Sequence, residues 1–431
     1  MLPHRFHIAL AASLAAAALA AAAVGAAVGG SPWSRISGPA QPGAQLGLAR
    51  SQDGVLHVIW NRGATQTTIA ETRLTAAGRP AGTSTVATGF DGNGGLALVV
   101  MPDRTLRLFA SGAPKAGSSS YGINTFTAPA HGASWALQAG TAWGGAAANA
   151  TGVIGAALTG DGQPVTAWRG FAAAGVPPSS IPQTAYVADQ TATRLATDGA
   201  SGAVVLAGTT LAGKGGMAVE PILPGRGAQV LLPLQSNLTD YNNGISGRIG
   251  APGVFVAYAD GKAARLYRYG RSSKTLATGA FNSATLCSGP EGRLWVAWGG
   301  NAGGLFVTRS NRAVSGFEPV QKLGLPQGPG LTFLQCEGSA GPADLFADSG
   351  GFFHTHVLAH LSLSARTAKT KVTISARDAG DPVAGVSVAV GGKHLKTDAH
   401  GLVSMTLRAG SYSASATAAG YATASARFTV R

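Results

Sequence analysis

Acidic side chains, which could supply general acids, general bases or nucleophiles, are scarce in this sequence. Its 431 residues contain 18 Asp and Glu against 32 Lys and Arg. Several of the acids lie in Gly-rich turns between short apolar runs, where Asp accepts hydrogen bonds from nearby backbone amides. These are Asp53, Asp103, Asp161, Asp198 and Glu291. Because glycoside hydrolysis needs a positioned carboxylate pair, we predict no catalytic residues.

Three histidines, His354, His356 and His360, recur at even spacing and would share one face of a strand. Positions four apart on a strand are about 13 Å apart, too far for a single tetrahedral zinc ion. A site built from His354, His356 and a distant ligand is the alternative. No phosphate-binding loop, dinucleotide fingerprint or zinc-protease helix motif occurs in the sequence. We predict no metal and no cofactor.

Aromatic, amide and arginine side chains gather in segments that would join strands. Aromatic faces beside amides and guanidinium groups suit sugar rings, which need a stacking surface and hydrogen-bond partners. The alternative is that these are ordinary solvated loops. The predicted ligand-binding residues are Arg62, Trp143, Arg169, Asp240, Tyr241 and Asn301.

The elements that would position these loops repeat along the chain. A short apolar strand, a Gly/Asp/Pro turn and a second apolar strand recur seven times, as in LGLARSQDGVLHVIW (46–60) and ATLCSGPEGRLWVAW (284–298). Four strands per repeat of about 40 to 50 residues are typical of a propeller blade. We predict an all-β fold with a β-propeller over residues 31–363, seven blades being favoured and six the alternative. Ring closure would need a strand from the segment around Trp33 to Ile36, which the sequence leaves open.

The two cysteines, Cys287 and Cys336, occupy the same place in two successive repeats. Equivalent innermost positions of adjacent blades are neighbours in space. An exported chain with one pair of cysteines favours a disulfide. We therefore predict a Cys287–Cys336 bond.

The hairpin turns resemble those of sialidase-like, BNR-repeat propellers, over about residues 33–362. Their Asp box survives only in fragments, the better one being Ala130, Gly132, Ser134 and Trp135. The resemblance implies an exo-acting glycoside hydrolase with an arginine cluster, a nucleophilic Tyr with a Glu partner, and an Asp. The arginine element near the start of that family is absent here, so hydrolysis is the alternative to non-catalytic binding.

The last sixty residues have a different pattern. Apolar and polar residues alternate with turns every eight to twelve residues, which predicts a small β-sandwich over 372–431 after a basic linker at 364–371. This segment is similar to carboxypeptidase regulatory-like and transthyretin-like modules. The matching residues are Pro382, Val383, Gly385, Val386, Val388, Thr397, Asp398, Gly401, Gly410 and Tyr412.

Residues 1–30 combine Arg5 with an Ala/Leu/Val run and no acid, which predicts a cleavable signal peptide. An uncleaved anchor is the alternative. The net charge of +14 favours polyanionic partners, and a dispersed basic surface that only aids solubility is the other interpretation. We expect an extracellular or cell-surface monomer, without a transmembrane segment after cleavage. Its partner would be an anionic glycan, a cell-wall polymer or an extracellular protein, and not nucleic acid.

Overall fold

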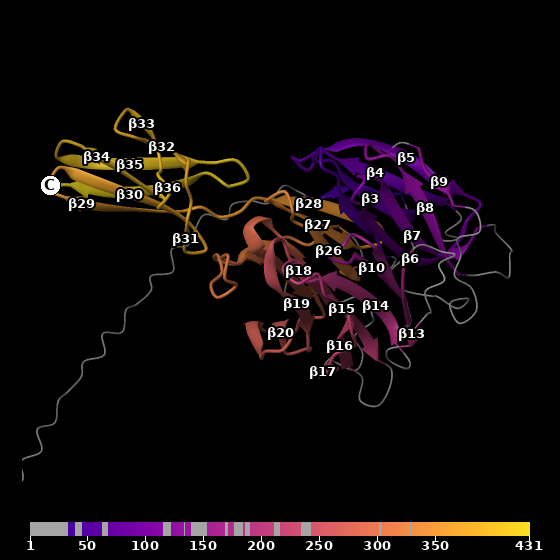
Figure 1. Ribbon diagram of the computed structural model, residues 1–431. Coiled ribbons are helices and arrows are strands. Elements are labelled where there is room, and N and C mark those ends of the chain that lie inside the picture. The colour runs from indigo at the N-terminus through magenta and orange to yellow at the C-terminus, as the bar shows by residue number, and fades with distance from the viewer. Residues whose placement is uncertain are drawn as a thin grey trace, which may run out of the picture.

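The computed structural model describes residues 33–38, 45–62, 68–114, 122–132, 134–138, 153–168, 171–175, 184–185, 190–210, 216–233, 243–300, 304–327 and 330–431. Within these residues the chain is built from antiparallel β-sheets of four strands each (Figure 1). The predicted leader lies outside them. No helix in the described ranges is long and apolar enough to cross a membrane.

The first four sheets follow the chain in order, each as a four-stranded meander. The first contains β2 (Gly47–Arg50), β3 (Leu56–Arg62), β4 (Thr68–Leu74) and β5 (Pro80–Thr88). The second contains β6 (Asp91–Val100), β7 (Leu106–Ala113), β8 (Gly122–Ala128) and β9 (Ala136–Leu137). The third contains β10 (Ile154–Leu158), β11 (Pro164–Trp168), β12 (Phe171–Ala174) and β13 (Thr184–Ala185). The fourth contains β14 (Gln190–Thr197), β15 (Val204–Thr210), β16 (Gly216–Leu223) and β17 (Val230–Leu232).

Three further sheets complete this series. The fifth contains β18 (Asn243–Arg248), β19 (Ala251–Ala259), β20 (Ala263–Arg268) and β21 (Ser273–Thr278). The sixth contains β22 (Ser283–Ser288), β23 (Leu294–Gly300), β24 (Gly304–Arg309) and β25 (Gln321–Leu323), with a short 3-10 turn at Pro290–Gly292. The seventh contains β26 (Phe333–Glu337), β27 (Ala343–Asp348), β28 (Phe352–Val357) and the N-terminal β1 (Ser34–Arg35).

The first strands of these sheets, β2, β6, β10, β14, β18, β22 and β26, contact one another in sequence, and β26 returns to β2. A closed ring of radially packed sheets is a β-propeller, as the repeat predicted. The ring is closed by β1, which pairs with β28 through Ser34–His354 and Arg35–Phe353. Trp60, Trp168 and Trp298, which lie at or near the ends of second strands, are buried between sheets. Burial of both faces of each sheet explains why the second strands read as continuous apolar runs.

The turn between the first two strands carries a residue with positive φ in each of the seven sheets. Glycine holds this conformation without a steric penalty, and Gly54, Gly162 and Gly202 do so at φ of +85°, +83° and +71°. Arg104 and Glu291 adopt the same positive φ although their Cβ atoms make it unfavourable. Recurrent glycine at these turns is therefore a backbone requirement of the repeat.

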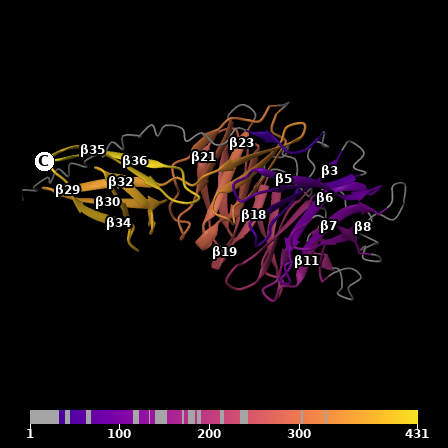
Figure 2. The same cartoon turned by 90° about the horizontal axis from the view of Figure 1, so that it is seen from above.

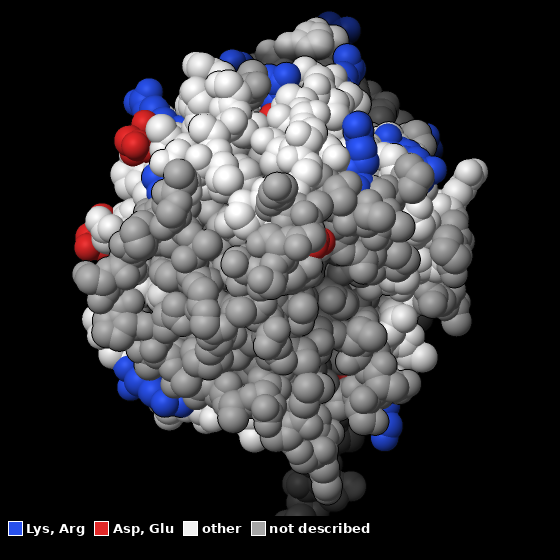
Figure 3. Space-filling view, turned by 90° about the vertical axis from the view of Figure 1, so that its right-hand side faces the viewer, with Lys and Arg blue, Asp and Glu red and all other residues white. Residues whose placement is uncertain are grey.

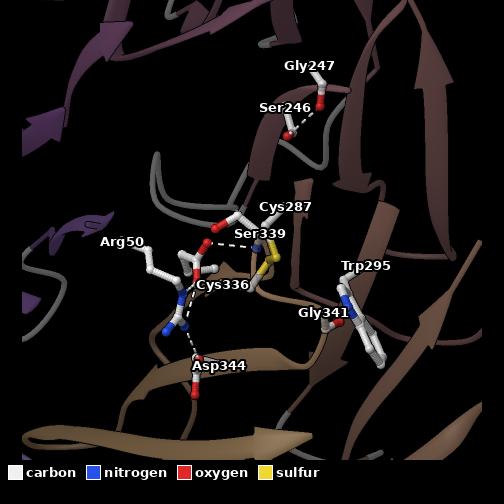
Figure 4. The surroundings of a disulfide bond; sticks show 10 residues. Arg50, Ser246, Gly247, Cys287, Trp295, Cys336, Ser339, Gly341 and Asp344 are labelled. Atoms are coloured by element: carbon white, nitrogen blue, oxygen red, sulfur yellow. Dashed lines mark hydrogen bonds and ion pairs between the residues drawn. A yellow bond between two sulfur atoms is a disulfide. The ribbon is translucent and has the colours of Figure 1, made fainter. Parts of the chain in front are cut away.

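Cys287 on β22 and Cys336 on β26 form the disulfide that the repeat register predicted (Figure 4). Both belong to the first strands of adjacent sheets, so the bond joins the sixth sheet to the seventh. Beside it, Trp295 Nε1 donates a hydrogen bond to the Gly341 carbonyl at 2.8 Å. The same two sheets are thus linked covalently and by a buried indole.

The C-terminal segment forms two more sheets, seen beside the propeller in Figures 1 and 2. One contains β29 (Ser362–Ala368), β30 (Lys371–Asp378), β31 (Asp381–Pro382) and β34 (Leu402–Thr406). The other contains β32 (Ser387–Val390), β33 (Lys393–Lys396), β35 (Gly410–Thr417) and β36 (Ala424–Val430). Val372 and Ile374 of the first share one apolar core with Val388 and Ala416 of the second.

The predicted linker at 364–371 is corrected by this arrangement. Residues 362–368 form β29, which pairs with β30 along its whole length. Most of its side chains are exposed, whereas Leu363 and Ala365 pack against the sandwich core. The sequence of an edge strand with one solvated face resembles that of a polar linker, because few of its side chains point toward the core.

Candidate functional site

Only one of the six predicted ligand-binding residues lies within the described part of the chain. Arg62 ends β3 at the end of the first sheet away from the hairpin turns, and its guanidinium lies 5.7 Å from the centre of the Trp60 ring. Trp143, Arg169, Asp240, Tyr241 and Asn301 lie outside the described residues. The predicted ligand face therefore remains a prediction.

The centre of the ring holds a small cavity of about 200 Å³, lined by the first strands of all seven sheets. Arg194 is the one charged side chain in its lining, and its guanidinium lies 5.7 Å from the centre of the Phe333 ring. The Gln45 side chain forms two hydrogen bonds with the backbone of Ile154, one as donor and one as acceptor. The Gln335 side chain forms the same pair of bonds with the backbone of Leu46. The described lining contains no carboxylate, so it offers no pair for acid and base catalysis.

Ser51, His57 and Glu71 form a buried line that resembles a catalytic triad. The Ser51 hydroxyl lies 3.1 Å from His57 Nε2, and His57 Nδ1 lies 2.6 Å from Glu71 Oε1. The Ser51 hydroxyl, however, also bonds Asp53 and the Val55 carbonyl within its own turn. All three triad-like side chains are less than 5% exposed. The hydroxyl is therefore committed to turn structure, and the line is a buried polar network.

A second network surrounds Asp344. Its Oδ1 accepts hydrogen bonds from His354 Nε2 at 2.8 Å and from His356 Nδ1 at 2.9 Å, while Oδ2 accepts one from Arg50. These bonds lower the pKa of Asp344 to about 2, against the opposing effect of burial. His360 lies apart from this pair, and the described residues contain no group of three or more His, Cys, Asp or Glu that could hold a metal ion.

A further charged cluster lies where the sixth sheet meets the C-terminal sandwich. Asp378, at the end of β30, accepts hydrogen bonds from Arg309 Nη1 at 3.0 Å and from the Tyr421 hydroxyl at 2.8 Å. Arg293 forms ion pairs with Asp378 at 3.4 Å and with Asp381 at 2.9 Å. Arg309 also lies between the rings of Trp295 and Tyr421. Arg293, Arg309 and Asp378 are almost fully buried, so this cluster fixes the sandwich on the propeller.

Glu318 faces Asp378 within this cluster. Burial and a hydrogen bond with Asp378 raise the pKa of Glu318 to about 9. Glu318 Oε1 and Asp378 Oδ1 are both buried and accept no hydrogen bond from another donor, although Arg293 Nη1 lies 3.4 Å from Asp378 Oδ1 as an ion-pair partner. A proton carried by Glu318 satisfies both oxygens, since a protonated carboxyl is a donor. Burial together with Asp378 also raises the pKa of Tyr421, to about 12.

A cleft of about 540 Å³ opens beside this cluster. Its walls come from the hairpin turns of the sixth and seventh sheets, from the end of β24 and the turn after it, from Ala76 of the first sheet, and from two loops of the sandwich. Both parts of the chain are therefore needed to form it. Arg293, Arg309 and Arg312 line it with Glu291, Tyr421 and three prolines, Pro290, Pro342 and Pro382. Its volume falls within the usual range for small-ligand sites.

Sequence reasoning did not identify this cleft. A signal was present in the matching spacing of two pairs, Arg309 with Arg312 and Asp378 with Asp381. In the structure, Arg309 bonds Asp378 and the Arg312 backbone amide bonds Asp381 at 2.8 Å. The pairing depends on how the two parts dock, which the spacing alone does not determine.

Comparison with known families gives no assignment. No family model and no curated protein matches the chain. The predicted resemblances to sialidase-like propellers and to carboxypeptidase regulatory-like modules therefore stay predictions.

Solved structures resemble the chain at the level of overall shape. AofleA from Arthrobotrys oligospora aligns with 12% identity and a TM-score of 0.45, over 68% of this chain and 90% of that one. A lectin of Aleuria aurantia, described as a six-bladed β-propeller with a novel fucose recognition mode, aligns with 11% identity and a TM-score of 0.41, over 72% and 90%. BBS1N, solved with ARL6DN, aligns with 10% identity and a TM-score of 0.46, over 77% and 97%. Likeness this low carries no inference about ligands.

Proposed function

We propose that the chain is an exported, non-catalytic propeller that binds an anionic glycan at the cell envelope. The observation that carries this proposal is the ring centre, where a cavity of about 200 Å³ holds one arginine and no carboxylate among its lining residues. Sialidase-type hydrolysis needs an arginine cluster beside a nucleophile and an acid, and the described lining of the cavity contains one arginine and no acid.

The surface charge supports an anionic ligand. The chain carries a net charge of +14. The face turned away from the sandwich shows lysines and arginines at several places along its rim, with few acids in view (Figure 3). Positive charge at a binding face attracts polyanions and fixes their orientation through paired hydrogen bonds. Arg62, which lies over the buried Trp60 ring, supplies an exposed cation at the end of the first sheet away from the hairpin turns.

The junction cluster does not favour hydrolysis, although it gathers three arginines near a tyrosine. A nucleophilic tyrosine needs an accessible oxygen that loses its proton readily. The Tyr421 hydroxyl instead donates to buried Asp378, and its pKa is raised to about 12. The arrangement therefore supports binding rather than covalent catalysis.

A glycan array tests the proposal. The intact chain is applied at low and at high salt, and the same preparation is assayed with a fluorogenic sialoside. We expect binding to acidic glycans that weakens with salt, and no turnover. Arg62→Ala should weaken binding, whereas Arg427→Ala, an exposed arginine on the sandwich strand β36, should not. The proposal is overturned if the protein hydrolyses the sialoside and the substitution of a single carboxylate abolishes this turnover.

A further inference from the structure

The cleft between propeller and sandwich contains an exposed ion pair that differs from the buried ones behind it. Arg312 and Glu291 have exposed side-chain fractions of 45% and 55%. Both the Nε and the Nη2 of Arg312 bond the same Glu291 oxygen, Oε2, at 2.8 and 2.7 Å. A guanidinium edge is best matched by two oxygens, one for each N–H. Glu291 therefore meets the two N–H groups of this edge with one oxygen instead of two.

The backbone of Glu291 is also held in an unfavourable conformation. Its φ is +58°, in the left-handed region that favours glycine, and it lies between Pro290 and Gly292 in the tight turn of the sixth sheet. A positive-φ residue recurs at this turn in all seven sheets, so the conformation belongs to the repeat. Here the strain places a carboxylate against Arg312, at the opening of a cleft of about 540 Å³.

The other two arginines of the cleft cannot exchange their partner carboxylates for the carboxylate of a ligand. Arg293 and Arg309 are 2% and 4% exposed and pair with Asp378 and Asp381 of the sandwich, and Arg293 keeps both of these acids if Glu291, 3.8 Å from its Nε, moves away. Replacing such a buried partner would leave a buried charge unpaired, which is strongly unfavourable. Arg312 is the arginine of this cleft whose acid can move into solvent, because exposed pairs contribute little.

The remaining walls suit a sugar ring. Three prolines and the Tyr421 ring supply apolar surface, while Arg312 lies at the rim. A uronic acid presents a C–H-rich ring face together with one carboxylate of two oxygens, which matches this combination.

From this geometry we propose that the junction cleft binds the carboxylate of a uronic acid sugar through Arg312, with Glu291 as an internal competitor that the ligand displaces. This deepens the proposed function, because it rests on glycan binding and names a sugar class and a second site. The site lies at the hairpin-turn end of the sheets, whereas Arg62 lies at the opposite end.

Titration of the intact chain with glucuronate, followed by calorimetry or by the NMR signals of the arginine Nε–H groups, tests the proposal. Arg312→Ala should weaken glucuronate binding at least about tenfold. Glu291→Gln keeps the size of the side chain but removes its charge, and should tighten binding about two- to fivefold. Arg226→Ala removes a comparable exposed arginine, paired with Glu220 outside the cleft, and should change nothing.

Two ligand controls separate the parts of the proposal. The methyl ester of glucuronate keeps the ring but lacks the charge, and should bind at least about tenfold more weakly. Acetate carries only the carboxylate; if it binds as tightly as glucuronate, recognition of a sugar is refuted. Unchanged affinity in Arg312→Ala, or no gain in Glu291→Gln, refutes the site.

These outcomes are distinguishable from failure of the proposed function. If Arg312→Ala binds glucuronate as tightly as the parent does, while the parent still binds acidic glycans on the array and Arg62→Ala weakens that binding, the junction site is wrong and glycan binding stands. If the parent binds no glycan on the array but binds glucuronate through Arg312, the proposal for the propeller face fails instead.

Discussion

Replacing Glu318 with Gln should stabilise the protein above pH 5. Gln has the shape of a protonated Glu. Its amide N–H can donate to Asp378 Oδ1, and its carbonyl can accept the hydrogen bond that the His360 amide now gives to Glu318 at 3.0 Å. The substitution therefore retains the contacts of the junction but removes the proton that Glu318 must carry when folded.

The magnitude follows from the pKa of Glu318, which burial and Asp378 raise from 4.5 to about 9. Below pH 4.5 the carboxyl is protonated in both the folded and the unfolded chain. As the pH rises, the unfolded chain loses this proton first, so the free energy of unfolding falls by about 1.4 kcal/mol per pH unit until the folded carboxyl ionises near pH 9. At pH 7, Glu318→Gln should therefore be more stable than the parent by up to about 3 kcal/mol.

Urea unfolding at several values of pH between 5 and 9 measures this difference. The difference between variant and parent is the useful quantity, because other titrations cancel in it. One of these is His360, whose pKa is lowered by burial and whose contribution is lost as the pH falls. Glu291→Gln, at an exposed carboxyl of the same junction, is the control for removing one negative charge there. If the free energies of unfolding of Glu318→Gln and of the parent differ by the same amount at every pH, the claim that Glu318 carries a proton for Asp378 is refuted.

Three further predictions concern the propeller. Serine in place of both Cys287 and Cys336 should lower the free energy of unfolding by about 4 kcal/mol, as expected for opening a loop of 49 residues, and thermal unfolding with and without reductant checks this. Asp344→Asn should remove the loss of about 2 kcal/mol that the parent shows as the pH falls from 4 to 2, because the pKa of Asp344 is lowered to about 2; acid titration followed by tryptophan fluorescence measures it. Glu71→Ala should cost about 3 to 5 kcal/mol in urea unfolding, because it leaves the buried His57 ring and Ser84 hydroxyl without their acceptor.

The propeller could be predicted because its signals are local. Each hairpin carries its own apolar runs and its own positive-φ turn residue, such as Gly54 or Gly162, so the repeat is visible without tertiary information. The disulfide followed from the same register, since Cys287 and Cys336 occupy equivalent strands. The closure of the ring by Ser34 and Arg35 stayed open, because a strand of two residues has no periodic signal.

The junction could not be predicted, because its partners meet only after two separate parts have docked. Arg309 and Asp378 are 69 residues apart in the chain, and nothing in the local pattern around either one indicates the other. The exposed strand β29 has the sequence pattern of a linker for a related reason, since few of its side chains point toward the sandwich core. Of the predicted ligand face, Arg62 alone lies within the described residues, so that interpretation stands as a prediction.

Binding without turnover is the central claim, and one measurement tests it directly. An acidic oligosaccharide is brought to equilibrium with the intact chain by dialysis. The oligosaccharide is then recovered, and its molecular mass is measured by mass spectrometry. The account predicts that the sugar is retained with the protein at low salt, is released as salt rises, and is recovered at its original mass. A shortened sugar, or no retention at low salt, would contradict it.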